Sequence, residues 1–223
     1  MRKSFRLIAP AVMAATLATS LVACGSSTTG SGKTSSSSAP SVSKKPILTV
    51  PSLAGVQTSV TLDPSLLPTL TSLHVTPAPT GTATLTKPGG AATLNFPITG
   101  GHVTIYNKAA VTPYVQGIIN HDGSGLSFTA GGKTLTVENF AIDPGTSMLM
   151  AQVKQMKDAS IPLFFLDGSD LQVTPPGADG IAKLDGTKVE LSAPAAQAIN
   201  SYFGVTAFKA RMLIGIAHIQ AKG

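Results

Sequence analysis

The sequence predicts an all-β domain, mainly an antiparallel sandwich or barrel, with one short helix in its C-terminal half. Only 12% of the residues are charged and none is Trp, so the chain lacks the Glu- and Lys-rich composition of helical proteins. The 22 Gly and 16 Pro residues separate short apolar stretches, as turns do in a β protein. We expect a single domain over residues 51–223, long enough to bury a core without disulfide bonds.

The first 23 residues have the parts of an export signal. Arg2, Lys3 and Arg6 make a basic start, and residues 7–21 form an apolar segment too short to span a bilayer. The segment runs into Leu-Val-Ala-Cys at residues 21–24. This motif resembles the lipobox of bacterial lipoproteins, which are cut before the cysteine. We therefore predict a lipoprotein signal peptide over residues 1–23.

The lipobox resemblance implies a lipid anchor on Cys24. In that family the thiol takes a diacylglyceryl group and the freed amine is open to further acylation. The protein would then be held at the extracytoplasmic face of the cell membrane, since two acyl chains anchor stably where one binds only marginally. Cys24 is the chain's only cysteine, so none remains for a disulfide, a thiolate nucleophile or a zinc site. The alternative is an ordinary secretory signal with an incidental cysteine.

Residues 24–50 are expected to form a Ser/Gly/Thr-rich flexible tether. Hardly a hydrophobic residue occurs before Ser43, so the segment cannot bury enough apolar surface to offset its conformational entropy. A coil of this composition and length reaches about 25–30 Å. The β-rich domain would therefore stand off the membrane surface.

Alternating apolar residues predict the strands. Apolar side chains alternate with polar or small ones over residues 94–98 and again over residues 103–105. Gly100 and Gly101 lie between the two stretches, which indicates a hairpin. A second hairpin is expected where residues 126–128 and 135–137 flank Gly131 and Gly132. Further strands are predicted at residues 148–153, 161–166, 171–174 and 212–219.

Two local features interrupt these strands. Phe140 and Ile142 have the opposite parity from residues 135 and 137, so an extra residue, a bulge, is predicted near Glu138 and Asn139. The one helix is expected near residues 193–203, where Ser192 caps the start, Pro194 suits the first turn and Gly204 suits a left-handed end. Ala196, Ile199 and Phe203 share its apolar face.

Composition and motifs argue against several functions. Removal of the signal leaves 13 basic and 10 acidic residues without a basic patch, so no nucleic acid partner is expected. Ser124 lies between two glycines but lacks a nucleophile elbow, and Asp167 and Asp170 fit a plain turn better than a calcium site. The four histidines are not paired at a metal-binding spacing. We nominate no catalytic residue and no metal ligand, and we expect a protein that is not an enzyme.

Two histidines receive opposite predictions. His121 lies beside Asp122 in what reads as a polar loop after residues 115–119, where its side chain would be exposed for binding. His218 has the parity of Ile214 and Ile216, so a buried, hydrogen-bonded imidazole is expected there.

Residues 117–126 (Gly-Ile-Ile-Asn-His-Asp-Gly-Ser-Gly-Leu), followed by Val137, Asn139, Phe140, Ile142, Asp143 and Leu149, resemble the core of HtaA-like domains. The chain is also similar to actinobacterial secreted proteins that pair this core with an ending like residues 195–216. HtaA-like domains are β-rich surface modules, some of which bind haem through tyrosine and histidine. The resemblance places His121 at the histidine of that loop, while Tyr106 and Tyr114 both stay open as the tyrosine.

Two functional hypotheses rest on particular features of the chain, and a third, an envelope enzyme, has no nominated residues. The first is a lipid-anchored, non-enzymatic domain without a cofactor that binds or scaffolds a ligand at the cell envelope. The alternative is an HtaA-like haem or tetrapyrrole capture protein that uses His121 with Tyr106 or Tyr114.

Overall fold

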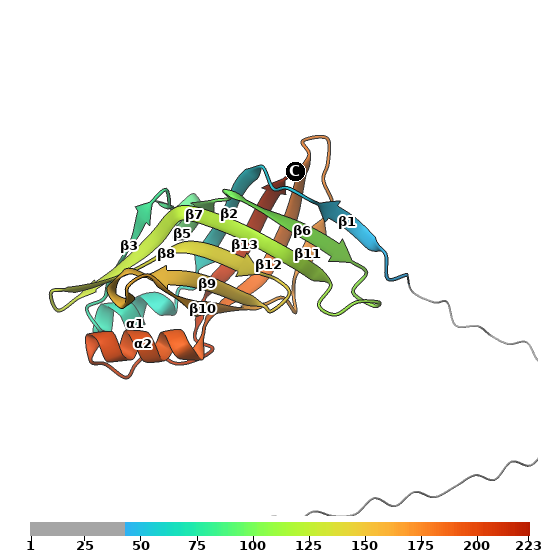
Figure 1. Ribbon diagram of the computed structural model, residues 1–223. Coiled ribbons are helices and arrows are strands. Elements are labelled where there is room, and N and C mark those ends of the chain that lie inside the picture. The colour runs from blue at the N-terminus through green and yellow to red at the C-terminus, as the bar shows by residue number, and fades with distance from the viewer. Residues whose placement is uncertain (1–42) are drawn as a thin grey trace, which may run out of the picture. The chain divides into compact units, whose positions relative to one another are not determined.

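The computed structural model describes residues 43–223, and in this range the all-β prediction is confirmed (Figure 1). Cys24, the predicted signal peptide and most of the predicted tether lie outside the described residues. Two α-helices and two 3₁₀ turns accompany the strands: α1 (Leu66–Ser72), α2 (Ala193–Phe203), η1 (Pro88–Gly90) and η2 (Lys154–Met156). The strands are β1 (Pro46–Val50), β2 (Gly55–Leu62), β3 (Thr76–Gly81), β4 (Thr84–Thr86), β5 (Thr93–Pro97), β6 (Gly100–Tyr106), β7 (Val115–Ala130), β8 (Lys133–Asp143), β9 (Met148–Val153), β10 (Ala159–Asp167), β11 (Gln172–Thr174), β12 (Ile181–Leu191) and β13 (Leu213–Lys222).

All these strands join one antiparallel sheet. Its order is β1-β6-β7-β8-β9-β10-β12-β13-β2-β5-β4, with β11 beside β12 and β3 beside β7. The sheet is open but curved. The Ile98 N–H donates to the Val56 carbonyl of β2, and the Thr99 N–H donates to the Asn120 carbonyl of β7, at 3.3 and 2.8 Å. Distant strands in this order are thereby brought together around one apolar core.

The prediction of a hairpin over residues 94–105 is wrong. β5 pairs with β2 and β4, whereas β6 pairs with β1 and β7. Both edges of β5 are thus occupied by strands from elsewhere in the sequence. The short segment between Pro97 and Gly100 carries the chain across the curved sheet instead of reversing it.

The second hairpin and the bulge are confirmed. β7 and β8 pair from Leu126 opposite Val137 to Ala130 opposite Lys133, with the predicted two-glycine turn between them. The register of β8 against β9 shifts between Glu138 and Ala141. The extra residues let Val137 and Phe140 both point into the core, at 1% and 3% exposure.

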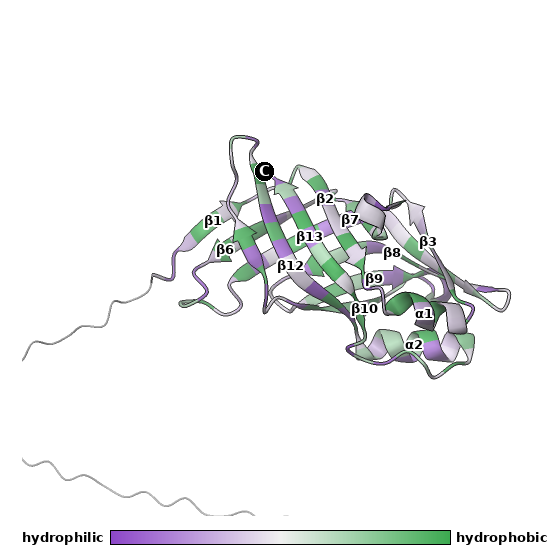
Figure 2. Ribbon diagram, turned by 180° about the vertical axis from the view of Figure 1, so that it is seen from behind, coloured by the Kyte–Doolittle hydropathy of each residue, from purple (hydrophilic) through white to green (hydrophobic). Residues whose placement is uncertain are grey.

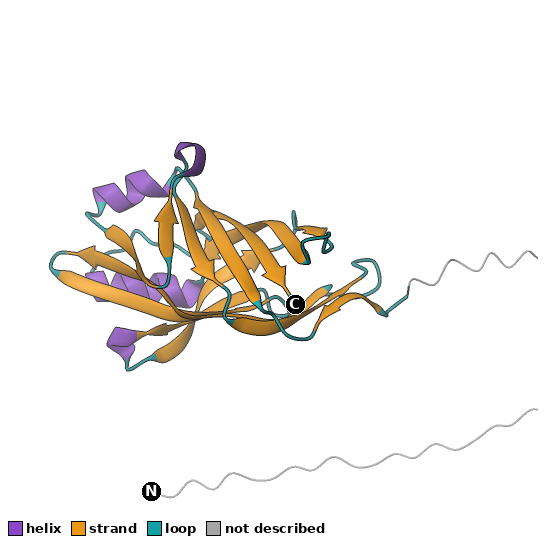
Figure 3. Cartoon of the chain, turned by 90° about the horizontal axis from the view of Figure 1, so that it is seen from above, coloured by secondary structure: helices purple, strands orange, loops and turns teal. Residues whose placement is uncertain are grey.

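The helices cover one end of the strands (Figure 3). α2 begins and ends as predicted, since the Ser192 hydroxyl accepts a hydrogen bond from the Ala195 N–H and Gly204 has a φ of 72°. α1 was not predicted from the sequence. Its buried Leu66 and Leu70 line an apolar pocket together with Ile199 of α2.

The sheet begins at Pro46, five residues before the expected domain boundary. Strand β1 pairs with β6, and Val50 is buried opposite Val103. Neither α-helix within residues 43–223 has the length and the run of apolar residues that a membrane span requires.

Candidate functional site

His121 lies in the core, which corrects the expectation of an exposed loop. It belongs to the continuous strand β7 and is 1% exposed. Its Nε2 atom is 2.8 Å from the Thr58 hydroxyl, and its ring meets the edge of Phe96 at 6.5 Å between centroids. Nδ1 has no hydrogen-bond partner among the described residues. The apolar space beside the ring has a volume of about 40 Å³, which is water-sized.

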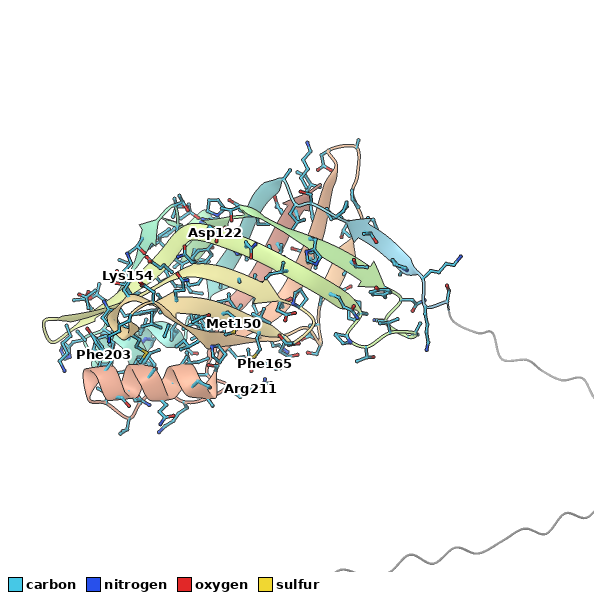
Figure 4. All side chains as sticks on the ribbon, in the orientation of Figure 1. Asp122, Met150, Lys154, Phe165, Phe203 and Arg211 are labelled. Atoms are coloured by element: carbon cyan, nitrogen blue, oxygen red, sulfur yellow. The ribbon has the colours of Figure 1, made fainter. Side chains whose placement is uncertain are left out.

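The neighbouring Asp122, labelled in Figure 4, lies on the opposite face of β7 from the buried His121. It is exposed, and its carboxylate accepts a hydrogen bond from Thr99 at 3.0 Å. Strand alternation explains the difference, because Ile119 and His121 share the inward face. The parity of Ile119 was the sequence signal that could have placed His121 inside.

Burial lowers the pKa of His121 to about 4, while the nearby backbone of Phe140 and the charge of Asp122 oppose this lowering. The imidazole is therefore neutral at physiological pH. A neutral ring with one bonded nitrogen is suited to ordering the core around Thr58.

Tyr114 lies at the mouth of a second cavity. This Tyr114 cavity has a volume of about 240 Å³. Its lining is apolar except for the hydroxyls of Ser147, Thr187 and Tyr114 itself. The lining residues are Pro113, Tyr114, Val115, Ile119, Ile142, Pro144, Ser147, Leu166, Gly168, Leu171, Leu184, Thr187 and Ile219.

Buried strand residues form the floor of the Tyr114 cavity and loops form its mouth. Ile119 and Leu184 are 0% and 4% exposed. The half-buried Tyr114 and Leu171 come from the loops before β7 and β11, and the Tyr114 hydroxyl donates a long hydrogen bond of 3.4 Å to the Leu171 carbonyl. Burial raises the pKa of Tyr114, so its hydroxyl remains protonated and able to donate.

Tyr106 does not line this cavity. It is a half-buried residue at the end of β6, and its N–H donates to the Tyr114 carbonyl at 2.7 Å. Tyr106 also pairs with Pro46, the first residue of β1. The mouth of the Tyr114 cavity therefore lies near the point where the chain enters the sheet.

The structure places the candidate ligands His121 and Tyr114 beside different spaces. His121 faces a space of about 40 Å³, whereas Tyr114 belongs to the separate cavity of about 240 Å³. Both volumes fall below the roughly 300–1,000 Å³ of pockets that take larger ligands. The buried imidazole contacts the Thr58 hydroxyl through Nε2 and lies near the backbone of Phe140.

Acidic residues and histidines do not gather elsewhere in the described range. Among residues 43–223, no group of three or more His, Cys, Asp or Glu side chains is placed to hold a metal ion. Asp167 accepts a hydrogen bond from the Ser169 N–H within its turn, and Asp170 pairs with Lys188.

The fold and the cavity together define an all-β domain with an apolar pocket at one end. Among solved structures, one similar to this chain is the C-terminal domain of HtaA from Corynebacterium glutamicum, at 17% sequence identity and a TM-score of 0.48. The match covers 76% of this chain and 98% of that domain. No protein-family model and no curated protein matches the chain.

Proposed function

We propose that this chain is a lipid-anchored, non-enzymatic binding protein of the cell envelope, and that the Tyr114 cavity holds a slender apolar ligand such as an acyl chain. The observation that carries the proposal is the apolar cavity of about 240 Å³. A cavity of roughly 150 Å³ already takes a benzene molecule, so this one has room for a ring or several methylenes. Each methylene that leaves water adds about 0.8 kcal/mol to binding.

The position of the mouth favours a ligand taken from the membrane. Tyr106 joins Pro46 to Tyr114 by strand pairing and a hydrogen bond, so the cavity opens near the start of the sheet. Only 21 residues separate Pro46 from Cys24, the residue expected to carry the lipid. If that anchor is present, a flexible tether with a reach of about 25–30 Å keeps the mouth within reach of the bilayer surface.

Tyr114 would select the orientation of the ligand. Its hydroxyl makes only a long bond to the Leu171 carbonyl. A polar head group at the mouth would replace that weak partner, while the apolar tail packs against the buried floor. Tyrosine suits such a boundary because its ring is apolar and its tip is polar.

Photolabelling tests this proposal on the full chain. The lipidated protein is placed in phosphatidylcholine vesicles with a diazirine-bearing palmitic acid analogue, irradiated, and mapped by peptide mass spectrometry. We expect labelled peptides that contain residues 113–115, 144–147 or 168–171. Label confined to other segments, or no label, would contradict the proposal.

Matched variants make the test specific. Val115→Phe fills the cavity from its wall and should reduce labelling at least threefold, whereas Thr84→Val, on the opposite face of the sheet, should leave it unchanged. If Val115→Phe melts far below the native chain, Thr187→Leu fills the same cavity from another wall. Equal labelling of a folded filling variant and the native chain would overturn the assignment of the cavity.

A further inference from the structure

The outer face of the sheet carries a polar groove that the proposed function does not use. Strand residues alternate between faces, so Thr58 and Val60 of β2 point into the core while Gln57, Ser59 and Thr61 point outward. Figure 2 shows the neighbouring strands β2, β12 and β13, with hydrophilic and hydrophobic residues alternating along them. We define the polar groove by its lining residues: Gln57, Ser59, Thr61, Thr84, Thr86, Pro88, Thr93, Asn95 and His218.

This groove is a shallow, open depression on the outer face of the sheet. Its volume is about 490 Å³. Two outward-facing residues on its floor are nonetheless buried, Thr93 at 5% and Asn95 at 9% exposure. Strand β4 pairs with β5 there, with Thr84 opposite Asn95 and Thr86 opposite Thr93, so the exposed Thr84 and Thr86 lie beside that floor at the edge of the sheet.

Side-chain hydrogen bonds hold the floor in one arrangement. Asn95 accepts a bond from the Ser59 hydroxyl at 2.8 Å and donates one to the Thr86 hydroxyl at 3.0 Å. Gln57 donates to Ser59 at 3.0 Å. The network orients the Asn95 amide and uses the hydroxyl hydrogens of Ser59 and Thr86, while the oxygen of each can still accept a bond from a ligand.

His218 closes one end of the groove, which corrects the expectation that it is buried. It lies opposite Ser59 in the register of β13 with β2 and opposite Asp185 in the register of β12 with β13. Its Nδ1 atom is 3.0 Å from the Asp185 carboxylate, and its side chain is 43% exposed. The carboxylate holds the ring so that Nε2 is the nitrogen left for another partner.

The chemistry of the lining excludes several ligand classes. The groove contains no Lys or Arg, so it cannot neutralise the phosphates of a nucleic acid. It contains no carboxylate for a hard cation, and Pro88 is its only apolar side chain. What the groove offers is a dense set of neutral hydroxyl and amide groups that donate and accept hydrogen bonds.

We propose that the polar groove binds a neutral carbohydrate, with hydroxyl groups of the sugar paired to the exposed hydroxyls of Thr84 and Thr86. Such a ligand presents closely spaced donors and acceptors without charge, which is the complement of this surface. Its binding does not depend on the Tyr114 cavity, because the two sites lie on opposite faces of the sheet. At the cell envelope the groove would attach the domain to a polysaccharide.

Saturation-transfer NMR tests the proposal on the full chain in a detergent without sugar, such as lauryldimethylamine oxide. The probes are maltohexaose, cellohexaose, chitohexaose and mannohexaose, with heparin as a charged comparison. We expect transfer to at least one neutral hexaose and weaker transfer to heparin. No transfer to any hexaose, or preference for heparin, would overturn the proposal.

Two isosteric variants locate the site. Thr84→Val and Thr86→Val each remove one hydroxyl from exposed positions of β4, and each should weaken binding about three- to tenfold. Thr129→Val removes an exposed hydroxyl far from the groove, and Val115→Phe fills the other cavity, so both should bind as the native chain does. Native affinity in both β4 variants, or cleavage of the hexaose into shorter sugars, would contradict a carbohydrate-binding groove.

Discussion

At the scale of single residues, the neutral His121 couples stability to pH. Its pKa is about 4 in the folded protein against an ordinary value of 6.5, so between these values the unfolded chain binds more protons. Stability is therefore fully present above pH 6.5 and falls as the pH drops toward 4. The expected loss is about 3 kcal/mol, from a shift of this size in a group that is almost fully buried.

Urea unfolding measured from pH 7.5 to 4 checks this prediction. His121→Asn keeps a polar side chain near Thr58 but removes the titrating group. We expect it to be less stable than the native chain at pH 7.5 and to lose less stability on acidification. If the free energy of unfolding depended on pH in the same way in both proteins, His121 would not be the source of the loss of stability at acid pH.

Gly101 shows a different residue-level constraint, a close approach of two backbones. Its φ is +121°, and an added Cβ atom would lie 2.1 Å from the Ile118 carbonyl oxygen of β7. Gly101→Ala should therefore destabilise the domain by about 2–3 kcal/mol. Gly100→Ala is the matched control, because Gly100 has nothing within 4 Å of that position and no positive φ. Thermal unfolding of both variants measures the difference, and equal melting temperatures would contradict the steric argument.

At the scale of elements, the Ser192 cap joins α2 to the sheet. Its hydroxyl accepts from the Ala195 N–H and donates to the Pro162 carbonyl of β10. Ser192→Ala removes both bonds from a buried site and should cost about 1–2 kcal/mol. Ser201→Ala, at an exposed position of the same helix, should change stability little. Denaturant midpoints of the two variants provide the comparison. If Ser192→Ala unfolded at the same denaturant concentration as the native chain, the cap would not contribute to stability.

Elements with local signals could be predicted from the sequence. The β7–β8 turn, the bulge after Glu138 and the helix ends at Ser192 and Gly204 each depend on residues a few positions apart. The pairing of β5 could not be predicted in this way, because its partner β2 lies more than thirty residues earlier. Strand order in a curved sheet depends on such distant contacts, which alternation alone does not contain.

The candidate sites likewise divide into features with a local sequence signal and features that depend on contacts between distant residues. Alternation could have placed His121 inside beside Ile119, but the loop signals of Asp122 and Gly123 suggested exposure instead. Tyr114 was nominated from the sequence, yet its cavity is made by loops before β7, β9 and β11 that only the fold brings together. The polar groove likewise joins four strands, and no short motif marks it.

At the scale of the whole molecule, one curved sheet separates two kinds of surface. Its inner face carries the apolar core and the Tyr114 cavity, and its outer face carries the polar groove. The two proposed ligands, an acyl chain and a neutral carbohydrate, differ in the same way as the faces. Both are found at a cell envelope, so the location of the protein decides whether either is encountered.

That location depends on Cys24, for which we expect lipidation. Two acyl chains hold a protein on a membrane far more stably than one, so the native chain should remain in the detergent phase on Triton X-114 partitioning and should take up an alkyne analogue of palmitate. Cys24→Ser cannot form the thioether, so the variant should lose the palmitate label and keep residues 1–23. Ser27→Ala, three positions further on, should behave as the native chain does. Mass spectrometry of the mature N-terminus gives the decisive measurement. An unmodified thiol on Cys24 would remove the anchor and with it the argument that the ligand is taken from the membrane.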